Sequence, residues 1–384
     1  MTNRESRGLR VLQVGMTRNL GGIETYLIEQ FRHLDKSKID YDFVNITGEY
    51  SICYDDEILA SGSKIFKVVS RHKNPLLHYW QWFTILLQHK GVYDVIVLNT
   101  NSLEYVFPLV LGKVFGIPVR VIHSHNSGFE NKQGLARRLL VGMNKKLLAW
   151  SANLRFACSQ VAGRWMFGDK PYHVIYNAID IRKYDANPVV RNETRQSLGL
   201  HSELTLLHVG RFSYQKNHSF LLDIFKEVHQ NQPDSVLLLV GDTSEESEFL
   251  TEVKRKIKEY GLEDSVRLLG RRDDVNKIMQ AADVLVMPSF FEGLGIVGIE
   301  AQASDLSLLL SDTVPKEVGL LPSTQFISLE AGLKVWAEAI VNSKQHNRQS
   351  RYEELKAAGY DIEHETKRVQ QLLLGKYNSM IKKE

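Results

Sequence analysis

The feature that most constrains the fold is a short β-branched run followed by a turn and an amphipathic segment. It first appears as a strand-like run at residues 9–15, a loop at 16–22 and a helical pattern at 23–34. The same order returns at residues 93–126 and several times between residues 204 and 304. Short apolar runs bounded by turn residues are typical of parallel strands buried on both faces. This alternation predicts α/β domains with doubly wound parallel sheets.

The length of 384 residues favours two domains over a single core. A polar, weakly periodic stretch at residues 178–203 separates the two sets of strand–helix units and predicts a linker. We therefore expect one Rossmann-like domain at residues 1–185 and a second at residues 186–360. A C-terminal helix at residues 361–384 is expected to pack back toward the N-terminal domain.

The amino-acid composition indicates the cellular compartment and limits the classes of binding partner. Two distant cysteines, Cys53 and Cys158, argue against a disulfide scaffold and suit a reducing cytoplasm. Neither a signal-peptide core nor an uncharged apolar run long enough for a transmembrane helix is evident in the sequence. The net charge of +3 divides into +8 for residues 1–190 and −5 for residues 191–384, which indicates different partners for the two halves unless the difference is chance. Nucleic acid is disfavoured, because the net charge is small and no recognition motif occurs.

Candidate phosphate-binding residues follow the predicted strands, where open α/β sheets bind their ligands. Arg211 follows one predicted strand, and Lys216 precedes a helix whose free N–H groups favour an anion. Together they would form a diphosphate pocket, although two ordinary surface cations are the alternative. Gly21 and Gly22 would let the backbone approach a phosphate, but a tight turn also needs glycine. Asn217 is a plausible N-cap for the helix after Lys216.

Two histidines, His123 and His125, end another predicted strand with their side chains on one face. They could be metal ligands, although no nearby cysteine or acidic pair completes a set. They could also be buried structural histidines. At the carboxyl end of a strand, contact with a sugar is the third interpretation.

Two glutamates stand out in "MPSFFEGLGIVGIEAQAS", residues 287–304. Glu292 lies in a glycine loop, and Glu300 is expected about two turns into the short helix that follows. Carboxylates accept hydrogen bonds from hydroxyls, and the loop amides can bind an anion. Such a set suits a nucleotide diphosphate sugar. The alternative is a capping or ion-paired role for each glutamate.

Several motifs together resemble family 4 retaining glycosyltransferases of the GT-B fold. They are "GGIE" at 21–24, "HSHN" at 123–126, "YNAID" at 176–180, "GRFSYQKN" at 210–217 and the Glu–seven residues–Glu motif at 292–300. These motifs are most similar to those of bacterial exopolysaccharide and capsular polysaccharide enzymes. The resemblance implies two Rossmann-like domains facing a central cleft. The chain departs from the pattern after residue 304, where a glycine is common, and at Ala178.

The resemblance also implies residue roles. Glu300 would hold the ribose, Glu292 the donor sugar, and Arg211 with Lys216 the diphosphate. His125 would touch the transferred sugar, with His123 as the alternative. Gly270 and Arg271 would meet the nucleobase. The remaining donor-binding positions are Gly21, Gly22, Gly210, Gly293, Leu294, Gly295, Ile296 and Val297. The catalytic set is His125, Arg211, Lys216 and Glu292. We expect no metal and no cofactor, because fixed cations can stabilise the leaving phosphate; the acidic pairs at 55–56 and 273–274 suit a polar loop and a helix start.

The reaction that the resemblance implies transfers a sugar from a UDP-sugar to a saccharide acceptor that is linked to a lipid. A basic amphipathic segment at residues 133–150 is predicted to lie on an anionic membrane, unless it packs on its own domain. The enzyme would then be cytoplasmic and peripheral at the inner face of the cell membrane. The apolar helix at residues 74–91 is expected in the core, although an exposed Trp80 or Trp82 would border the acceptor groove. The rival functions are a sugar-nucleotide epimerase of the same fold and a non-catalytic partner subunit. Retention of all four charged site residues argues against the partner subunit.

Overall fold

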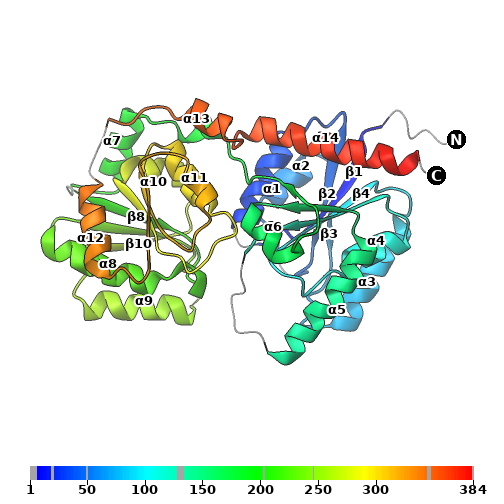
Figure 1. Cartoon of the computed structure of the whole chain (residues 1–384), viewed down its shortest axis with the longest axis horizontal. Coiled ribbons are helices and arrows are strands. Elements are labelled where there is room, and N and C mark those ends of the chain that lie inside the picture. The colour runs from blue at the N-terminus through cyan, green and yellow to red at the C-terminus, as the bar shows by residue number, and fades with distance from the viewer. Residues whose placement is uncertain are drawn as a thin grey trace. The chain divides into compact units, whose positions relative to one another are not determined.

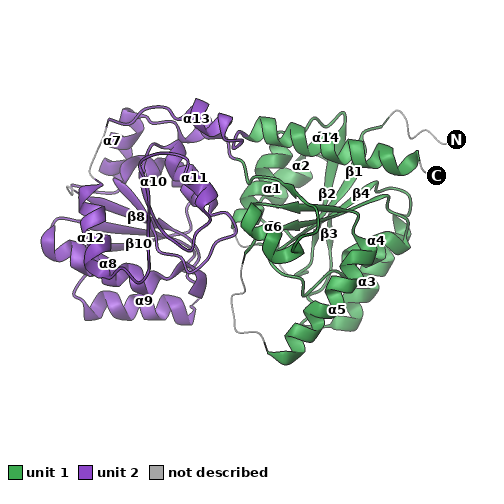
Figure 2. Cartoon of the chain, viewed as in Figure 1, with its two compact units in different colours: residues 1–178, 362–384 green, residues 179–361 purple. Residues whose placement is uncertain are grey.

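The structure is a computed structural model, and it describes residues 7–18, 21–48, 51–127, 134–201, 204–244, 246–343 and 347–382. The chain divides into two compact units (Figure 2). The first contains residues 1–178 and 362–384, and the second contains residues 179–361. No helix in the described ranges is both long enough and apolar enough to cross a bilayer.

The first unit is built on a parallel sheet with the order β3-β2-β1-β4-β5-β6-β7 (Figure 1). Its strands are β1 (Leu9–Val14), β2 (Ile39–Asn45), β3 (Ile65–Lys67), β4 (Val95–Thr100), β5 (Val119–Ser124), β6 (Leu154–Ala157) and β7 (His173–Val174). Its helices are α1 (Gly22–Arg32), α2 (Asp55–Ala60), α3 (Pro75–Gln88), α4 (Phe107–Val114), α5 (Leu135–Ser151), α6 (Gln160–Phe167) and α14 (Ile362–Ile381).

The second unit has a parallel sheet with the order β10-β9-β8-β11-β12-β13. Its strands are β8 (Thr205–Val209), β9 (Val236–Val240), β10 (Val266–Gly270), β11 (Val284–Met287), β12 (Ser307–Ser311) and β13 (Thr324–Ile327). Its α-helices are α7 (Pro188–Ser197), α8 (His218–Asn231), α9 (Glu248–Glu259), α10 (Val275–Ala281), α11 (Ile296–Ala303), α12 (Leu333–Asn342) and α13 (Tyr352–Ala357). Its 3₁₀ helices in the described ranges are η1 (Ile181–Tyr184), η2 (Tyr214–Lys216) and η3 (Lys316–Val318).

Both sheets have the doubly wound topology that the alternating pattern predicts, so the predicted fold class is confirmed. In each sheet the chain reverses its direction of strand addition once, between β1 and β4 and between β8 and β11. The loops that leave two such neighbouring strands diverge and form a crevice in which α/β proteins bind ligands. The fold therefore marks two places for a site, one in each unit.

The boundary between the units lies seven residues before the predicted position of 185/186. Ile179 forms a β-bridge with Asp361, and the Tyr184 backbone carbonyl accepts a hydrogen bond from the Gln280 side chain. These contacts join residues 179–185 to the second unit.

The stretch predicted as a linker is also structured, because it contains η1 and α7. The Arg191 guanidinium pairs with buried Asp283 at 2.5 Å and donates to the backbone carbonyl of Gln280 at 2.7 Å. The linker prediction was wrong because it relied on polar composition. The polar side chains of α7 bind backbone and carboxylate groups of its own unit.

Helix α14 returns to the first unit after the chain has completed the second. Its side chains Val369, Leu373 and Tyr377 are buried in the same apolar core as strands β1, β2, β4 and β5. The Glu365 carboxylate accepts a hydrogen bond from the backbone N–H of Tyr176 at 2.9 Å. The first unit is thus assembled from both ends of the chain.

Candidate functional site

The loops after β8 and β11 are held together at the switch point of the second sheet. The backbone N–H of Phe290 donates to the carbonyl of Gln215 at 2.9 Å, and the rings of Tyr214 and Phe290 stack at 4.6 Å. Asn217 occupies the N-cap position of α8, but its side chain does not cap the helix. It donates instead to the carbonyl of Pro288 at 3.1 Å, from a left-handed backbone with φ of 55°.

Glu292 lies at the centre of this arrangement and is 5% exposed. Its carboxylate accepts hydrogen bonds from the Lys216 ammonium at 2.7 Å, the Ser289 hydroxyl at 2.7 Å and the Gln215 amide at 2.9 Å. The ion-paired role that was an alternative for Glu292 is therefore present. Burial of the carboxylate is tolerated because a cation and two neutral donors satisfy it.

The position of Lys216 depends on the absence of a side chain at Gly210. A Cβ atom at Gly210 would lie 2.9 Å from Cε of Lys216 and 3.0 Å from its Cδ. The lysine stem therefore occupies the space beside the backbone that leaves β8. Gly210 thus contributes to the site by making room for the lysine.

Two buried histidines, His208 and His218, lie close enough to Lys216 to feel its charge, and their ring centroids are 4.6 Å apart. Burial lowers the pKa of His208 to about 4 and the pKa of His218 well below its ordinary value; the charge of Lys216 lowers both further. Both imidazoles are consequently neutral near pH 7, and Lys216 carries the positive charge at this point.

Glu300 belongs to α11, just over one turn into the helix rather than two, because the helix begins at Ile296. It is 7% exposed, and its carboxylate accepts a hydrogen bond from the Tyr184 hydroxyl at 2.8 Å. Tyr184 is the last residue of η1, far away in sequence.

The glycine loop brings the first turn of α11 to the same place. Gly295 has φ of +87°, and a Cβ atom there would lie 3.0 Å from Cε of Met287 and 3.8 Å from Cβ of Glu292. Gly293, Leu294 and Gly295 precede the helix, and Ile296 and Val297 begin it. The N–H groups of a first helical turn have no partner within the helix and favour an anion.

The other predicted residues of this unit occupy neighbouring strand ends. Arg211 is exposed and follows β8, whereas Gly270 ends β10 with φ of +67° and Arg271 follows it. The structure thus brings Lys216 and Glu292 into direct contact. It places Arg211, Gly270 and Arg271 on the same edge of the sheet, because all parallel strands end there.

In the first unit, the predicted glycines lie at the start of α1. Gly21 is the N-cap, with an extended backbone at φ of −153°, and Gly22 is the first helical residue. The glycine that the backbone requires is Gly15, which was not predicted: it has φ of +124°, and a Cβ atom there would lie 2.4 Å from the Asn99 carbonyl oxygen. Glu24 in the first turn accepts hydrogen bonds from the backbone N–H and the hydroxyl of Thr17.

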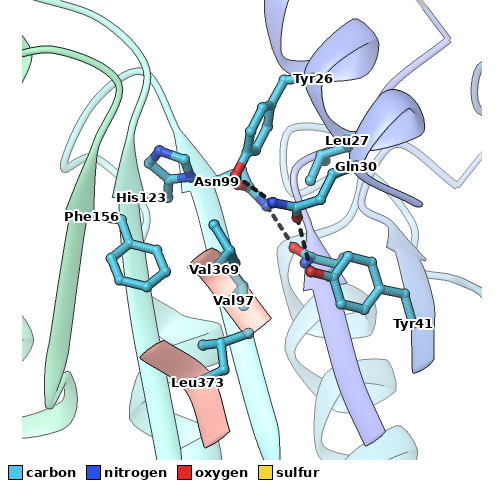
Figure 3. Close-up of a pocket in the computed structure, with 11 residues that line it drawn as sticks. Tyr26, Leu27, Gln30, Tyr41, Val97, Asn99, His123, Phe156, Val369 and Leu373 are labelled. Atoms are coloured by element: carbon cyan, nitrogen blue, oxygen red, sulfur yellow. Dashed lines mark hydrogen bonds between the residues drawn. The ribbon is translucent and has the colours of Figure 1, made fainter. Parts of the chain in front are cut away.

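His123 and His125 do share one face, with ring centroids 3.9 Å apart. His123 is 1% exposed and lies between the rings of Tyr26 and Phe156 (Figure 3). It lines a small cavity, which has room for one water molecule at most. His123 therefore has the surroundings of a structural histidine.

His125 lies one residue beyond the end of β5 and is 8% exposed. Its Nε2 atom is 3.1 Å from Oδ1 of Asn99, whose amide donates to the Gln13 side chain and the Val14 carbonyl. Since Asn99 uses its amide there, Nε2 of His125 must be the donor and Nδ1 the unprotonated nitrogen. Burial lowers the pKa of His125 to about 3, so the ring is neutral.

Sequence reasoning missed Gln215, Ser289, Tyr184, Gly15 and Asn99. Gln215 and Ser289 stand beside predicted residues in "GRFSYQKN" and "PSFFEG", so proximity in sequence could have found them. Tyr184 lies 116 residues from Glu300, and only the fold joins them. No group of three metal-ligating side chains is present in the described ranges.

Comparison with known proteins gives a consistent result. Residues 190–318 match the family described as "Glycosyl transferases group 1". The Bacillus subtilis (strain 168) protein named "Putative glycosyltransferase EpsF" is 31% identical over 365 residues, which cover 92% of this chain and 93% of that protein. The UDP-Gal:alpha-D-GlcNAc-diphosphoundecaprenol alpha-1,3-galactosyltransferase of Escherichia coli is 23% identical over 79% of each chain. The crystal structure of Anabaena HepE in complex with UDP and glucose superposes with a TM-score of 0.71 at 19% identity, covering 98% of this chain and 99% of HepE.

Proposed function

The chain belongs to the group 1 glycosyltransferases, and on this premise we propose that it transfers a sugar from a nucleotide diphosphate donor to a saccharide acceptor. The observation that carries the proposal is the contact of Lys216 with Glu292 at the switch point between β8 and β11. It combines a cation suited to phosphate with a carboxylate suited to sugar hydroxyls, next to the first turn of α11.

Lys216 is the proposed electrostatic catalyst. An ammonium has three N–H donors, and Glu292 accepts one of them. The other two can reach a diphosphate oxygen, together with Arg211 and the amides of residues 293–297. Negative charge grows on the diphosphate as the glycosidic bond breaks, so donors fixed in advance lower the barrier.

The two glutamates are proposed to hold the two hydroxyl-bearing parts of the donor. Glu292 is fixed by Ser289 and Gln215 beside Lys216, which suits contact with the transferred sugar. Glu300 belongs to α11 and is fixed by the hydroxyl of Tyr184, an arrangement that suits the ribose diol. The backbone at Gly270 and Arg271 is assigned to the nucleobase.

In the first unit, Nδ1 of His125 has no hydrogen-bond partner among the residues described. An unprotonated imidazole nitrogen accepts a hydrogen bond, so we assign it to a hydroxyl of the transferred sugar. The first turn of α1, at Gly21 and Gly22, is assigned to phosphate.

The finer parts of the proposal are a UDP donor, retention of configuration, no cofactor besides the donor, and a lipid-linked acceptor in exopolysaccharide or capsule synthesis. The name of the Escherichia coli relative includes a UDP-Gal donor and a diphosphoundecaprenol-linked acceptor, and HepE was crystallised with UDP and glucose. The motif resemblance to family 4 supports retention.

The test is to incubate the purified protein with UDP-sugars and a lipid-diphosphate-linked GlcNAc acceptor, and to measure UDP release and the product by NMR. We expect acceptor-dependent UDP release, an α-linked product from an α-linked donor, and the same activity with a chelator. Lys216→Gln should lower the rate of UDP release about 100-fold. Lys258→Gln, which changes an exposed lysine of α9, should leave it unchanged. Interconversion of UDP-sugars without acceptor would favour the epimerase instead.

A further inference from the structure

Three neighbouring helices of the first unit expose an unusual amount of apolar surface. Of the eighteen large apolar side chains that are exposed in the described ranges, twelve belong to α3, α4 and α5. We call this surface the α3–α5 face. Its members are Leu76, Leu77, Tyr79, Trp80, Phe83, Leu87, Val114, Leu135, Leu139, Met143, Leu147 and Trp150.

The face is continuous. Helix α4 contacts both α3 and α5, and the three lie side by side at the lower right of Figure 1. Trp80 stacks on Phe83 at 6.0 Å, and Phe83 meets Phe115 at 5.3 Å. Two residues before Phe115, the Lys113 ammonium lies 4.0 Å from the centre of the Trp150 ring. A path of side-chain contacts and short sequence steps therefore links α3 to α5.

Helical spacing shows that these side chains form outward stripes. On α3, Leu76, Trp80, Phe83 and Leu87 follow each other at intervals of three or four, opposite buried Trp82 and Ile85. The 17 residues of α5 include only three buried ones, Asn144, Leu148 and Ser151. The alternative that α5 packs on its own domain therefore holds in part, because α5 contacts α4 but leaves most of its surface exposed. The core prediction for α3 holds for one side only.

In the stretch of chain that contains α3, α4 and α5, nearly all charged side chains are positive. Residues 58–168 carry 14 Lys and Arg but only three acidic residues. Asp94 is buried, Glu104 pairs with Arg137, and Glu130 lies outside the described residues. Arg138 and Lys145 are exposed along one edge of the apolar stripe of α5, with Lys146 beside it.

We propose that the α3–α5 face docks on the surface of an anionic lipid bilayer, with α5 lying in the plane of the interface. Exposed apolar side chains next to Lys and Arg, with a Trp on each of two helices, are the features that partition into a charged interface. A second copy of the chain would bring like charges against each other, which opposes self-association through this face. The proposal does not depend on sugar transfer.

The test is flotation of the full-length protein with vesicles, without donor or acceptor. Wild type should float with vesicles of phosphatidylcholine and phosphatidylglycerol, bind phosphatidylcholine alone much more weakly, and dissociate as salt rises. Lys145→Glu/Lys146→Glu should weaken partitioning at least about 30-fold, because each basic residue near such a surface contributes about 1 kcal/mol. Trp80→Ser/Leu139→Ser should weaken it about 10-fold or more.

Matched variants on the second unit separate the face from general surface effects. Lys258→Glu/Lys334→Glu changes the net charge equally, and Val189→Ser/Val335→Ser removes two exposed apolar side chains; both should bind like wild type. The proposal is overturned if wild type does not float with anionic vesicles, or if the control variants lose binding as the face variants do. A dimer in sedimentation that Trp80→Ser/Leu139→Ser dissociates would assign the face to self-association instead.

Discussion

At the scale of the residue, the pair formed by Lys216 and Glu292 is the feature with the largest consequences. Their side chains are 14% and 6% exposed, so each charge depends on the other. The same contact positions the cation for the role in catalysis that we propose for it.

Lys216→Gln is expected to lower kcat about 100-fold, corresponding to about 3 kcal/mol of barrier, with a smaller change in acceptor KM. The reason is that the lysine acts mainly on charge that develops on the leaving diphosphate. Steady-state kinetics measure the effect, and thermal unfolding of Lys216→Gln and Lys216→Gln/Glu292→Gln reports the effect of an unpaired glutamate. A wild-type kcat in a folded Lys216→Gln protein would contradict the assignment.

Glu300→Gln is expected to weaken UDP binding by about 10-fold or more, because hydrogen bonds to a charged acceptor contribute about 1.5–3 kcal/mol. Tyr184→Phe should have a smaller effect in the same direction, since it removes only the hydroxyl that orients Glu300. Isothermal titration with UDP measures both. Equal affinities for wild type and Glu300→Gln would remove Glu300 from the ribose site.

Burial of His208 predicts a pH dependence of stability. Its folded-state pKa of about 4 lies below the unfolded value near 6.5, so the unfolded state binds the proton more readily. Its contribution is complete above pH 6.5 and is lost as the pH falls from 6.5 toward 4. Between pH 8.0 and 5.5 this histidine alone should lower the free energy of unfolding by about 1 kcal/mol. Urea unfolding of His208→Gln should show a loss smaller by that amount; an identical loss would refute the prediction.

At the scale of the element, the start of α11 is specified by Gly295, whose left-handed backbone turns the loop after β11 into the helix. Gly295→Ala is expected to reduce stability by about 1–2 kcal/mol through backbone strain and to weaken UDP binding. Gly199→Ala is the matched control, because Gly199 is also left-handed but has open space around it. It should lose similar stability and keep its affinity for UDP. Equal affinity in both variants would show that the turn does not matter for the donor.

At the scale of the whole molecule, the two units differ in continuity. Residues 179–361 form one continuous segment with its own core, whereas residues 1–178 lack α14 when cut from the rest. The loss of Val369, Leu373 and Tyr377 from that core removes roughly 5–8 kcal/mol of hydrophobic stabilisation, which is comparable with the stability of a domain.

We therefore expect residues 179–361, produced alone, to fold and bind UDP, and residues 1–178, produced alone, to remain unfolded or aggregate. Circular dichroism and titration with UDP check the two fragments. A cooperatively unfolding 1–178 fragment would show that α14 is dispensable.

The sequence alone predicted the two doubly wound sheets and placed Arg211, Lys216, Glu292 and Glu300 after strands or at helix starts. It could do so because buried parallel strands need apolar β-branched runs, and because strand ends are where such sheets bind ligands. It was wrong where polar composition suggested a linker at 178–203, since the partners of Arg191 are about 90 residues away along the chain.

The sequence by itself determined the strands and helices of the two sheets, because their periodic apolar pattern follows from local geometry and burial. The tertiary structure decided the contacts between distant residues: Tyr184 with Glu300, Lys216 with Glu292, α14 with the strands of the first unit, and the stripes of α3 and α5 left outside the core. These depend on which segments the fold brings side by side, because hydrogen bonds and packing act over a few ångströms in space regardless of separation along the chain.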